Sequence, residues 1–295
     1  MPRRPRRLSP ATLFFAALSL VLAGVVVWLW RTRVSAPSPP APTAATPTAP
    51  RGKATLRPAR PTALARRSPA AAPSGTPRIA ILIDDLGNDR AAAARIAAWP
   101  WPVAGAVLPN LPGSAPTARA LEDSGKEVLL HLPMEPQGYP GVRPGPGVVL
   151  RAQSDGEIAA TLERDLATVP GASGINNHMG SAATADPRVM RAVATVLSRR
   201  GLFFVDSRTT TSTVARDEAE KARVPSTSRR VFLDDTATTE AVSRAFDELV
   251  RRAKEEGEAL AIGHPHPATL DVLERELRNL PAKGVRLVRV RDLVR

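Results

Sequence analysis

The sequence predicts an α/β domain, arranged as a barrel of seven or eight β/α units, over residues 78–295. Two observations support this fold class. From residue 78 onward, short apolar runs that suit strands alternate with segments of helical periodicity, a pattern typical of a mostly parallel sheet. About seven or eight such units in roughly 218 residues fit a barrel better than an open sheet.

Strands are predicted where short apolar runs are bounded by turn residues. In chain order these runs are 79–83, 103–107, 128–132, 172–176, 202–205, 231–233, 259–262 and 286–288. Helices are predicted between them, where apolar residues recur on one helical face. These segments are 90–98, 115–124, 155–168, 187–200, 213–222, 239–256 and 269–280.

Residues at the predicted helix ends agree with these boundaries. Ser154 with Glu157, and Asp186 before Pro187, are typical helix starts, because a cap oxygen accepts free amides and an N1 proline has none. Glycine is frequent just after a helix, and it occurs in that place at Gly125, Gly201 and Gly257.

Residues 1–30 have the order of a membrane anchor. Four arginines precede an uncharged apolar run at 11–30, and two arginines follow it. The run matches a bilayer-spanning helix and exceeds a typical signal-peptide core. The arginine bias favours a cytoplasmic stub at 1–10 and a translocated C-terminal domain. We therefore expect a single-pass inner-membrane protein with its domain in the periplasm or otherwise outside the cytoplasm; a cleavage site at 34–36 and a twin-arginine signal are the alternatives.

A disordered linker is predicted at residues 31–77. The 11 prolines between 35 and 77 lack the backbone N–H that helices and β-sheets need for hydrogen bonding. Residues 1–77 hold 12 of the 41 Lys and Arg residues and none of the 28 acidic ones. The domain at 78–295 is therefore nearly neutral, which argues against a nucleic-acid partner. The absence of cysteine excludes thiolate metal sites and disulfides.

Candidate functional residues gather at the predicted strand ends. All four histidines, namely His131, His178, His264 and His266, follow apolar runs, and the first run ends in the pair Asp84 and Asp85. Ligands bind outside the carboxyl ends of parallel strands, so these side chains are expected to meet on one face. The other strand ends on that face carry Asn110, Glu135, Asn176, Asn177, Asp206, Arg208, Asp234 and Asp235.

Imidazole and carboxylate groups without sulfur suit a divalent metal in a hydrolytic centre. Each residue also has a plainer explanation. Acids after a strand are often helix caps, and for Asp234 and Asp235 we favour that interpretation. Asp206 with Arg208 could be only a loop-orienting ion pair. Convergence on one face favours the metal hypothesis, since independent structural explanations must otherwise hold at every strand end.

Five segments also resemble the divergent polysaccharide deacetylase family. They are IDDLG at 83–87, HLPMEP at 131–136, GINNHMGS at 174–181, DSRT at 206–209 and IGHPHP at 262–267. The resemblance covers nearly all of residues 78–295. It implies a distorted (β/α) barrel of the polysaccharide deacetylase type, in a superfamily whose metal-dependent members remove N- or O-acetyl groups from sugars.

The resemblance also implies roles for individual residues. Asp84 would be the base, Asp85 and His131 metal ligands, and His264 the general acid. The superfamily has a second metal-binding histidine where this chain has Glu135, so His178 is the candidate that completes the ligand set. The Arg and aromatic of the superfamily's third motif are absent from GINNHMGS. Substrate-binding or supporting roles would fall to Glu135, Asn176, Asn177, Asp206, Arg208 and His266, and Glu135 would be either a further metal ligand or a group that orients His131.

The sequence thus predicts a metal-dependent hydrolase that removes acetyl groups from a polysaccharide or cell-wall sugar. Zinc is the first expectation, and Mn, Co, Ni and Fe stay open. A cell-envelope glycan-binding or assembly factor that keeps the fold without turnover is the alternative. A glycosidase with paired acids is a third possibility, which leaves the histidines unexplained. The loop at 137–147, rich in Gly and Pro, could be a lid or a partner site.

Overall fold

The computed structural model describes residues 75–295. The predicted stub at 1–10, the anchor at 11–30 and all but the last residues of the linker lie outside this range. Among residues 75–295, no helix has both the length and the apolar character needed to cross a bilayer.

The described residues form one sheet of nine strands whose pairings are all parallel. The strand order is β6-β5-β4-β3-β2-β1-β8-β7, and β9 pairs with the start of β1. In chain order the strands are β1 (Arg78–Leu86), β2 (Ala104–Val107), β3 (Val128–Met134), β4 (Ala172–Met179), β5 (Phe203–Asp206), β6 (Ser226–Ser228), β7 (Val231–Phe232), β8 (Glu258–Gly263) and β9 (Arg286–Leu287).

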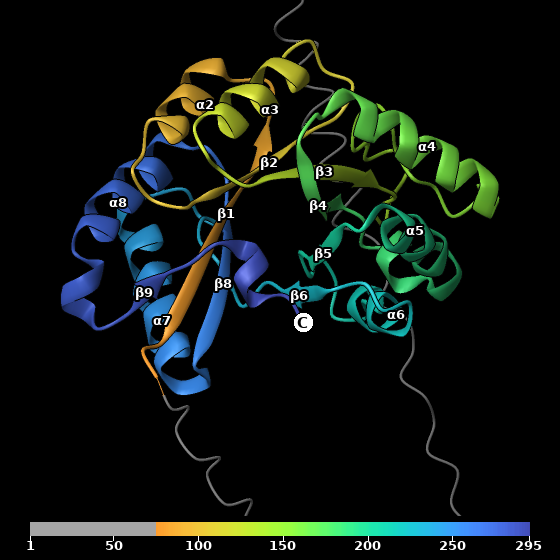
Figure 1. The fold of residues 1–295 in the computed structure, drawn as a ribbon. Coiled ribbons are helices and arrows are strands. Elements are labelled where there is room, and N and C mark those ends of the chain that lie inside the picture. The colour runs from red at the N-terminus through yellow and green to blue at the C-terminus, as the bar shows by residue number, and fades with distance from the viewer. Residues whose placement is uncertain (1–74) are drawn as a thin grey trace, which may run out of the picture. The chain divides into compact units, whose positions relative to one another are not determined.

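The predicted parallel α/β architecture is confirmed, in the form of a sheet that curls into a partial barrel (Figure 1). Within the described chain the curl stays open, because the two end strands, β6 and β7, are not paired with each other. Strand β6 was not predicted. Its sequence, Ser-Thr-Ser, has no apolar residue, so it carries no alternation from which a strand could be recognised.

Helices lie on the outer side of the curled sheet (Figure 1). They are α2 (Arg90–Ala97), α3 (Ser114–Asp123), α4 (Asp155–Thr168), α5 (Pro187–Arg200), α6 (Ala215–Lys221), α7 (Thr239–Glu256) and α8 (Pro267–Arg278), with short 3₁₀ turns η1 (Ala183–Ala185), η2 (Leu280–Lys283) and η3 (Val290–Leu293). Three helices, α4, α5 and α7, have the predicted bounds. Helix α8 begins two residues earlier than predicted, at Pro267, because proline suits the first helical position.

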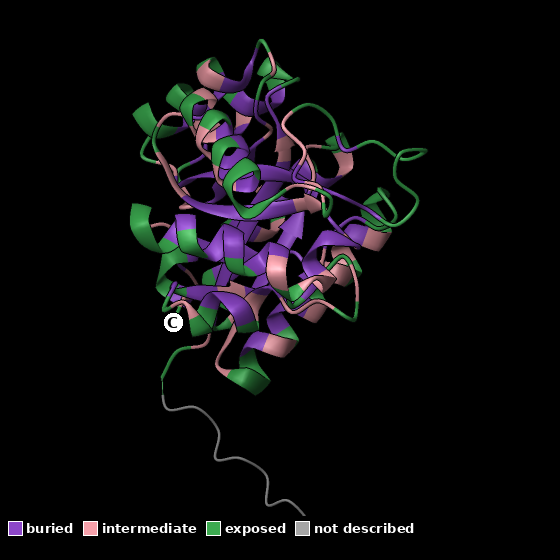
Figure 2. Ribbon diagram, turned by 90° about the vertical axis from the view of Figure 1, so that its right-hand side faces the viewer, coloured by how far each residue is buried: buried purple, intermediate pink, exposed green. Residues whose placement is uncertain are grey.

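Alternation of side chains along each strand divides the core into two layers. Outward-facing residues such as Ile79, Ile81 and Ile83 pack against the helices. Inward-facing residues such as Ala80 and Leu82 form a smaller cluster enclosed by the curl. Figure 2 shows the resulting pattern, with buried strands inside and exposed residues on the outer helical surfaces.

The N-terminal ends of the strands are covered by the segment around η3. Val290 and Leu293 belong to the inner cluster, and the buried carboxylate of Glu127 accepts the backbone N–H of Val290 at 2.7 Å. The backbones of Ser226 and Arg295 exchange two hydrogen bonds of 2.9 and 3.1 Å. The inward-facing polar residues lie at the opposite, carboxyl ends of the strands, where Asp84, His131 and Asn176 are buried and Asp85 and His264 are partly exposed.

Candidate metal centre

Two consecutive carboxylates reach the same site at the end of β1. In a regular strand Asp84 and Asp85 would point to opposite faces. Here the register with β2 shifts between Ile83 and Leu86, and Asp85 has a left-handed backbone with φ of 58°. Such a bulge re-aims a side chain. As a result both carboxylates lie near Nε2 of His131, with Asp84 Oδ2 at 3.5 Å and Asp85 Oδ1 at 3.2 Å.

Three ligand-type atoms form a close triangle. Asp85 Oδ1 lies 3.2 Å from His131 Nε2 and 2.9 Å from His178 Nδ1, and the two ring nitrogens are 3.1 Å apart. Ligands held at roughly 2.0–2.2 Å from one ion in tetrahedral or octahedral angles would be separated by roughly 2.8–3.6 Å. Asp85, His131 and His178 therefore form a group able to hold a metal ion.

The fit of a cation is supported by an unsatisfied oxygen. Asp85 Oδ1 is buried, and although two ring nitrogens are close to it, no donor meets it with hydrogen-bond geometry. A buried carboxylate oxygen without a donor is costly, and a cation would satisfy it. Burial by itself would raise the pKa of Asp85, but His131 and His178 outweigh it and hold that pKa far below its usual range.

Asn176 fixes the ring of His131. The two residues are register partners on β3 and β4, and Asn176 Oδ1 lies 3.0 Å from His131 Nδ1. The amide Nδ2 donates to Asp84 Oδ1 at 2.8 Å and to Ser207 Oγ at 3.1 Å. Because a carboxylate requires a donor, the amide orientation is determined, so Oδ1 accepts and Nδ1 of His131 carries a proton. The Nε2 of His131 then directs its lone pair into the triangle.

The surroundings of His131 favour positive charge. Burial alone would lower its pKa, but the carboxylates of Asp84 and Asp85 raise it overall. The site thus stabilises a cation beside Nε2, either a proton or a metal ion.

Asp84 differs from Asp85 in its environment. Its side chain is almost fully buried, and burial raises its pKa even though His131, His264 and Asn176 act in the opposite direction. A carboxylate with a raised pKa is suited to accept a proton near neutral pH. Asp84 therefore has the properties of a base, whereas Asp85 has those of a permanently charged ligand.

On the opposite side of the centre, His264 is held by Asp234. The backbone N–H of His264 donates to Asp234 Oδ2 at 2.7 Å, and its Nδ1 lies 3.0 Å from Asp234 Oδ1. Thr269 Oγ1 also donates to Oδ2, at 2.7 Å. The remaining ring nitrogen, Nε2, lies 3.7 Å from Asp85 Oδ2. Burial lowers the pKa of His264, but Asp234 and the two site carboxylates raise it overall.

The interpretation of Asp234 as a helix cap is wrong. Helix α7 is capped by Thr238, whose side chain accepts the N–H of Ala241. Asp234 is instead the partner of His264, a role that sequence reasoning missed. The sequence did show an acidic pair, Asp234 and Asp235, after the sixth predicted strand. Before the fold is known, an acid that caps the next helix looks the same in sequence as an acid that pairs with a distant histidine.

Glu135 lies apart from the triangle. Its carboxylate accepts the backbone N–H of Arg151 at 2.7 Å and the Nε of Arg151 at 3.0 Å. We expected Glu135 either to bind metal or to orient His131. In the structure the orienting contact is made by Asn176, and Glu135 anchors the chain that returns beside β3.

Three further predicted residues stabilise the loops around the site. Asn177 Oδ1 accepts the N–H of Ser207 at 2.9 Å, which joins the ends of β4 and β5. Asp206 accepts the N–H of Arg208 at 2.8 Å and the hydroxyl of Thr213 at 3.0 Å. Of the two explanations considered for Asp206 and Arg208, the loop-orienting one is closer, but the contact is a side-chain-to-backbone turn and not an ion pair.

His266 is the N-cap residue of α8, and its side chain makes no capping hydrogen bond. Its ring centroid lies 5.8 Å from that of His264. Asp234, His264 and His266 are close enough to form a second metal-type group. Both oxygens of Asp234 already accept hydrogen bonds, so this group has less need of an ion than the triangle.

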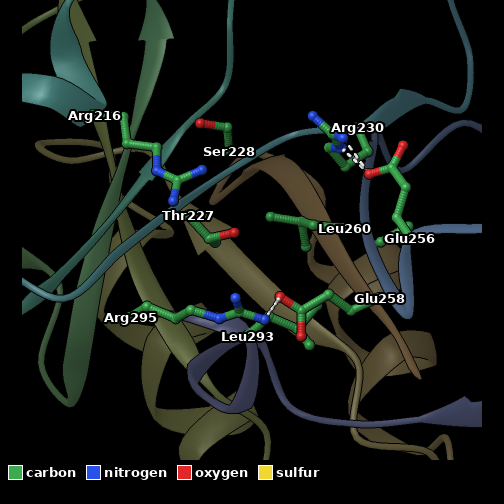
Figure 3. A pocket seen from close by; sticks show the side chains of 10 residues that line it. Arg216, Thr227, Ser228, Arg230, Glu256, Glu258, Leu260, Leu293 and Arg295 are labelled. Atoms are coloured by element: carbon green, nitrogen blue, oxygen red, sulfur yellow. Dashed lines mark hydrogen bonds and ion pairs between the residues drawn. The ribbon is translucent and has the colours of Figure 1, made fainter. Parts of the chain in front are cut away.

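A separate hollow of about 200 Å³ lies between β6 and β8, where the sheet is open. Figure 3 shows three arginines around it, Arg216, Arg230 and Arg295. Arg230 pairs with Glu256, and Arg295 with Glu258. Arg216 pairs with Glu220 at 2.7 Å. Because each arginine has an acidic partner, the hollow offers no excess positive charge to an anion.

Comparisons with known proteins extend over the same part of the chain. A family model described as divergent polysaccharide deacetylase matches residues 81–294. An uncharacterized protein of Haemophilus influenzae is 38% identical over 218 residues, which cover 74% of this chain and 77% of that protein. The uncharacterized protein YibQ of Escherichia coli K12 is 37% identical over 218 residues, covering 74% of this chain and 67% of that protein.

Among solved structures, an uncharacterized protein from Agrobacterium tumefaciens C58 is similar, with a TM-score of 0.71 and 25% identity over 74% of this chain and 89% of that chain. The family match includes every residue of the triangle, together with Asp84 and His264.

Proposed function

This chain belongs to the divergent polysaccharide deacetylase family, and we propose that it is a metal-dependent hydrolase that removes acetyl groups from a cell-envelope glycan. The observation that carries the proposal is the triangle of ligand atoms beside a buried carboxylate and an imidazole. A binding module would need neither a base nor an acid next to a metal group.

Asp85, His131 and His178 would hold the metal. Two imidazoles and one carboxylate suit zinc first, although the same donors also bind Mn, Co, Ni or Fe. A divalent ion held there would supply Lewis-acid chemistry, lowering the pKa of water and polarising the acetyl carbonyl. The proton on Nδ1 of His131, held by Asn176, keeps Nε2 available as a ligand.

Asp84 would accept the proton of the attacking water. Its second oxygen faces the triangle, while Asn176 holds the first at 2.8 Å, so the carboxylate is fixed in place before substrate binds. Because its pKa is raised by burial, it gains a proton more readily than an exposed aspartate.

His264 would protonate the departing sugar amine or hydroxyl. Asp234 accepts from Nδ1, which leaves the proton of Nε2 as the one directed toward the centre. The carboxylate of Asp234 also stabilises the imidazolium of His264 and so helps to raise the pKa of that ring. The pair thus supplies an acid on the side of the site opposite His131.

The proposed place of action is the periplasmic side of the inner membrane. This part rests on the sequence alone, namely the apolar run at 11–30 and the greater number of arginines before it. Such an anchor, followed by an extended linker, would let the domain reach glycan at some distance from the bilayer.

The test compares metal content and acetate release in the full-length protein and its variants. We expect near one equivalent of a transition metal, lost in an Asp85→Ala and His131→Ala double variant. Asp84→Asn should keep the metal and lose acetate release from acetylated wall sugars. Asp123→Asn, which removes an exposed carboxylate on α3, is the matched control and should behave like wild type.

Two results would contradict the proposal. A fully active Asp84→Asn would remove Asp84 as the base. Protein that neither contains metal nor takes it up, yet binds glycan without releasing acetate, would favour the non-catalytic glycan-binding alternative.

A further inference from the structure

Arg229 lies in the short connection between β6 and β7, two consecutive strands that are not paired with each other. Its backbone N–H donates to the carbonyl of Asp206, at the end of β5, at 2.9 Å. The next residue, Arg230, donates its N–H to the carbonyl of Leu260 on β8 at 2.8 Å. Arg229 is therefore located on the open side of the curled sheet, between its two end regions.

Two hydrogen bonds fix the side chain of Arg229 to the turn after β5. Its Nε donates to the carbonyl of Ser207 at 2.7 Å, and one terminal N–H donates to the carbonyl of Arg208 at 3.0 Å. Arg208 has a left-handed backbone with φ of 51°, a conformation that is uncommon for a residue with a side chain and persists where its surroundings hold it. The rigid fork of a guanidinium suits two consecutive carbonyls.

This turn is itself fixed by β4. The N–H of Ser207 donates to Asn177 Oδ1 at 2.9 Å, and Ser207 Oγ accepts from Asn176 at 3.1 Å. Both asparagines are buried, and β4 also carries His178 of the triangle. Arg229 is thus anchored to the part of the sheet that positions the candidate metal centre.

The face of the same guanidinium packs on β7. Its central carbon, Cζ, lies 4.9 Å from the centroid of the Phe232 ring, the arrangement of a cation–π contact. Strand β7 is only two residues long and pairs with β8. Backbone pairing over so short a length restrains the Phe232 ring weakly, so the contact with Arg229 contributes to its orientation.

The Phe232 ring in turn contacts His264. The ring centroids are 5.2 Å apart and the planes meet at 70°, a favourable edge contact. Asp234 holds the His264 ring at Nδ1, and one hydrogen bond leaves a ring able to tilt about that atom. The Phe232 ring restricts this tilt, and with it the direction of Nε2.

We propose that Arg229 is a positioning residue for the proton donor. It orients Phe232, which keeps the ring of His264 directed at the centre. The inference rests on the proposed function, in which His264 protonates the leaving group, and adds the residue that connects this acid to the end of β5 across the open side of the sheet. Arg229 would act through His264 and not by contact with the substrate.

The experiment measures acetate release by the full-length protein from two substrates that differ in their need for an acid. Oligomers of N-acetylglucosamine release an amine, which must gain a proton, whereas 4-nitrophenyl acetate releases a phenolate that leaves without one. In Arg229→Met, kcat on the oligomers should fall about 10- to 100-fold, as expected for a misplaced general acid. Its KM on the oligomers, its activity on 4-nitrophenyl acetate and its metal content should match wild type.

Arg230→Met is the matched control. Arg230 is the neighbouring arginine, but it is exposed and pairs with Glu256, so this variant should keep wild-type activity on both substrates. Arg229→Lys retains the charge without the planar fork of a guanidinium and should behave like Arg229→Met. Equal losses on both substrates in Arg229→Met would overturn the inference, because they would indicate a general effect on the fold.

A double variant tests whether Arg229 acts through His264. His264→Ala should lose activity on the oligomers alone, and adding Arg229→Met should cause no further loss, because the group that Arg229 positions is already absent. A further loss would contradict the inference. Phe232→Leu tests the intermediate contact without disturbing the turn at Arg208, and should show the same selective loss. Wild-type activity of Phe232→Leu on the oligomers would overturn the inference even where Arg229→Met does not fold.

Failure of the proposed function would look different, since wild type would then release acetate from neither substrate. NMR signals of the His264 ring protons, in full-length protein labelled at histidine, test the connection in that case. Their loss in His264→Ala assigns them. A shift of these signals in Arg229→Met but not in Arg230→Met would support the connection, whereas wild-type signals in Arg229→Met, or an equal shift in Arg230→Met, would reject it.

Discussion

The substitution Asp165→Asn should remove a large part of the dependence of stability on pH. Asp165 lies on α4, and its residue is only 1% exposed. One carboxylate oxygen accepts from Asn110 Nδ2 at 2.7 Å, whereas the other is buried without a donor. Burial raises the pKa of Asp165 to about 7, against the smaller opposing effects of Asn110 and Arg164.

The sign follows from comparing the folded and unfolded chains. The pKa is raised from 3.8 to about 7 on folding, so the folded protein favours the neutral acid. The associated stability is complete below about pH 4 and is lost as pH rises through about 7, at roughly 1.4 kcal/mol per pH unit. Between pH 5 and pH 8 wild type should therefore lose about 2.5 kcal/mol through this group.

Urea unfolding of the full-length protein at pH 5 and pH 8 measures this loss. The free energy of unfolding of Asp165→Asn, minus that of wild type, should be about 2.5 kcal/mol larger at pH 8 than at pH 5, because only wild type loses stability over this range. Asp123→Asn controls for the change in net charge. If the difference between Asp165→Asn and wild type is the same at both pH values, the buried carboxylate does not titrate as argued.

Three further outcomes are expected. Removal of metal by a chelator should lower the melting temperature, since a ligand present at 1,000 times its Kd adds about 4 kcal/mol to stability; an unchanged melting temperature would speak against a bound ion. Asn176→Ala should weaken metal affinity about 10- to 100-fold, because it frees the ring of His131, and a competition titration that gives wild-type affinity would exclude this role. Gly174→Ala should cost about 1–3 kcal/mol, because the added Cβ would lie 2.5 Å from the Phe203 ring; thermal unfolding at the wild-type temperature would refute it.

Helices with strong local signals were predicted with their correct ends. Helix α4 starts at the predicted capping box of Ser154 and Glu157, and α5 starts after the predicted cap of Asp186. These ends depend on residues within one turn of each other, so the sequence contains all that is needed to locate them. Strand β6 depends instead on its pairing with β5, which no local pattern of Ser and Thr reveals.

The same distinction applies to the site. Alternation along the strands predicts that inward-facing residues at the strand ends should meet, and the structure brings His131, Asn176 and His264 to one region. Alternation alone could not predict that Asp84 and Asp85 would both face inward, because that depends on a register shift between β1 and β2. The pairing of Asp234 with His264 was missed for a related reason: it joins residues 30 positions apart and replaces a plausible local interaction.

The position of β1 in the sheet has a consequence for the order in which the chain assembles. Strands β1 to β4, neighbours in both chain and sheet, carry Asp85, His131 and His178, so the candidate metal group belongs to the half of the domain that is synthesised first. Strand β1 also pairs with β8 and, at its start, with β9, and Arg78 meets Glu258 across 180 positions of sequence. Pairings of such long range form slowly. A nascent or truncated chain that ends before β8 would therefore contain the candidate metal ligands but lack His264, so the proposed proton donor would be the last of these groups to join the site.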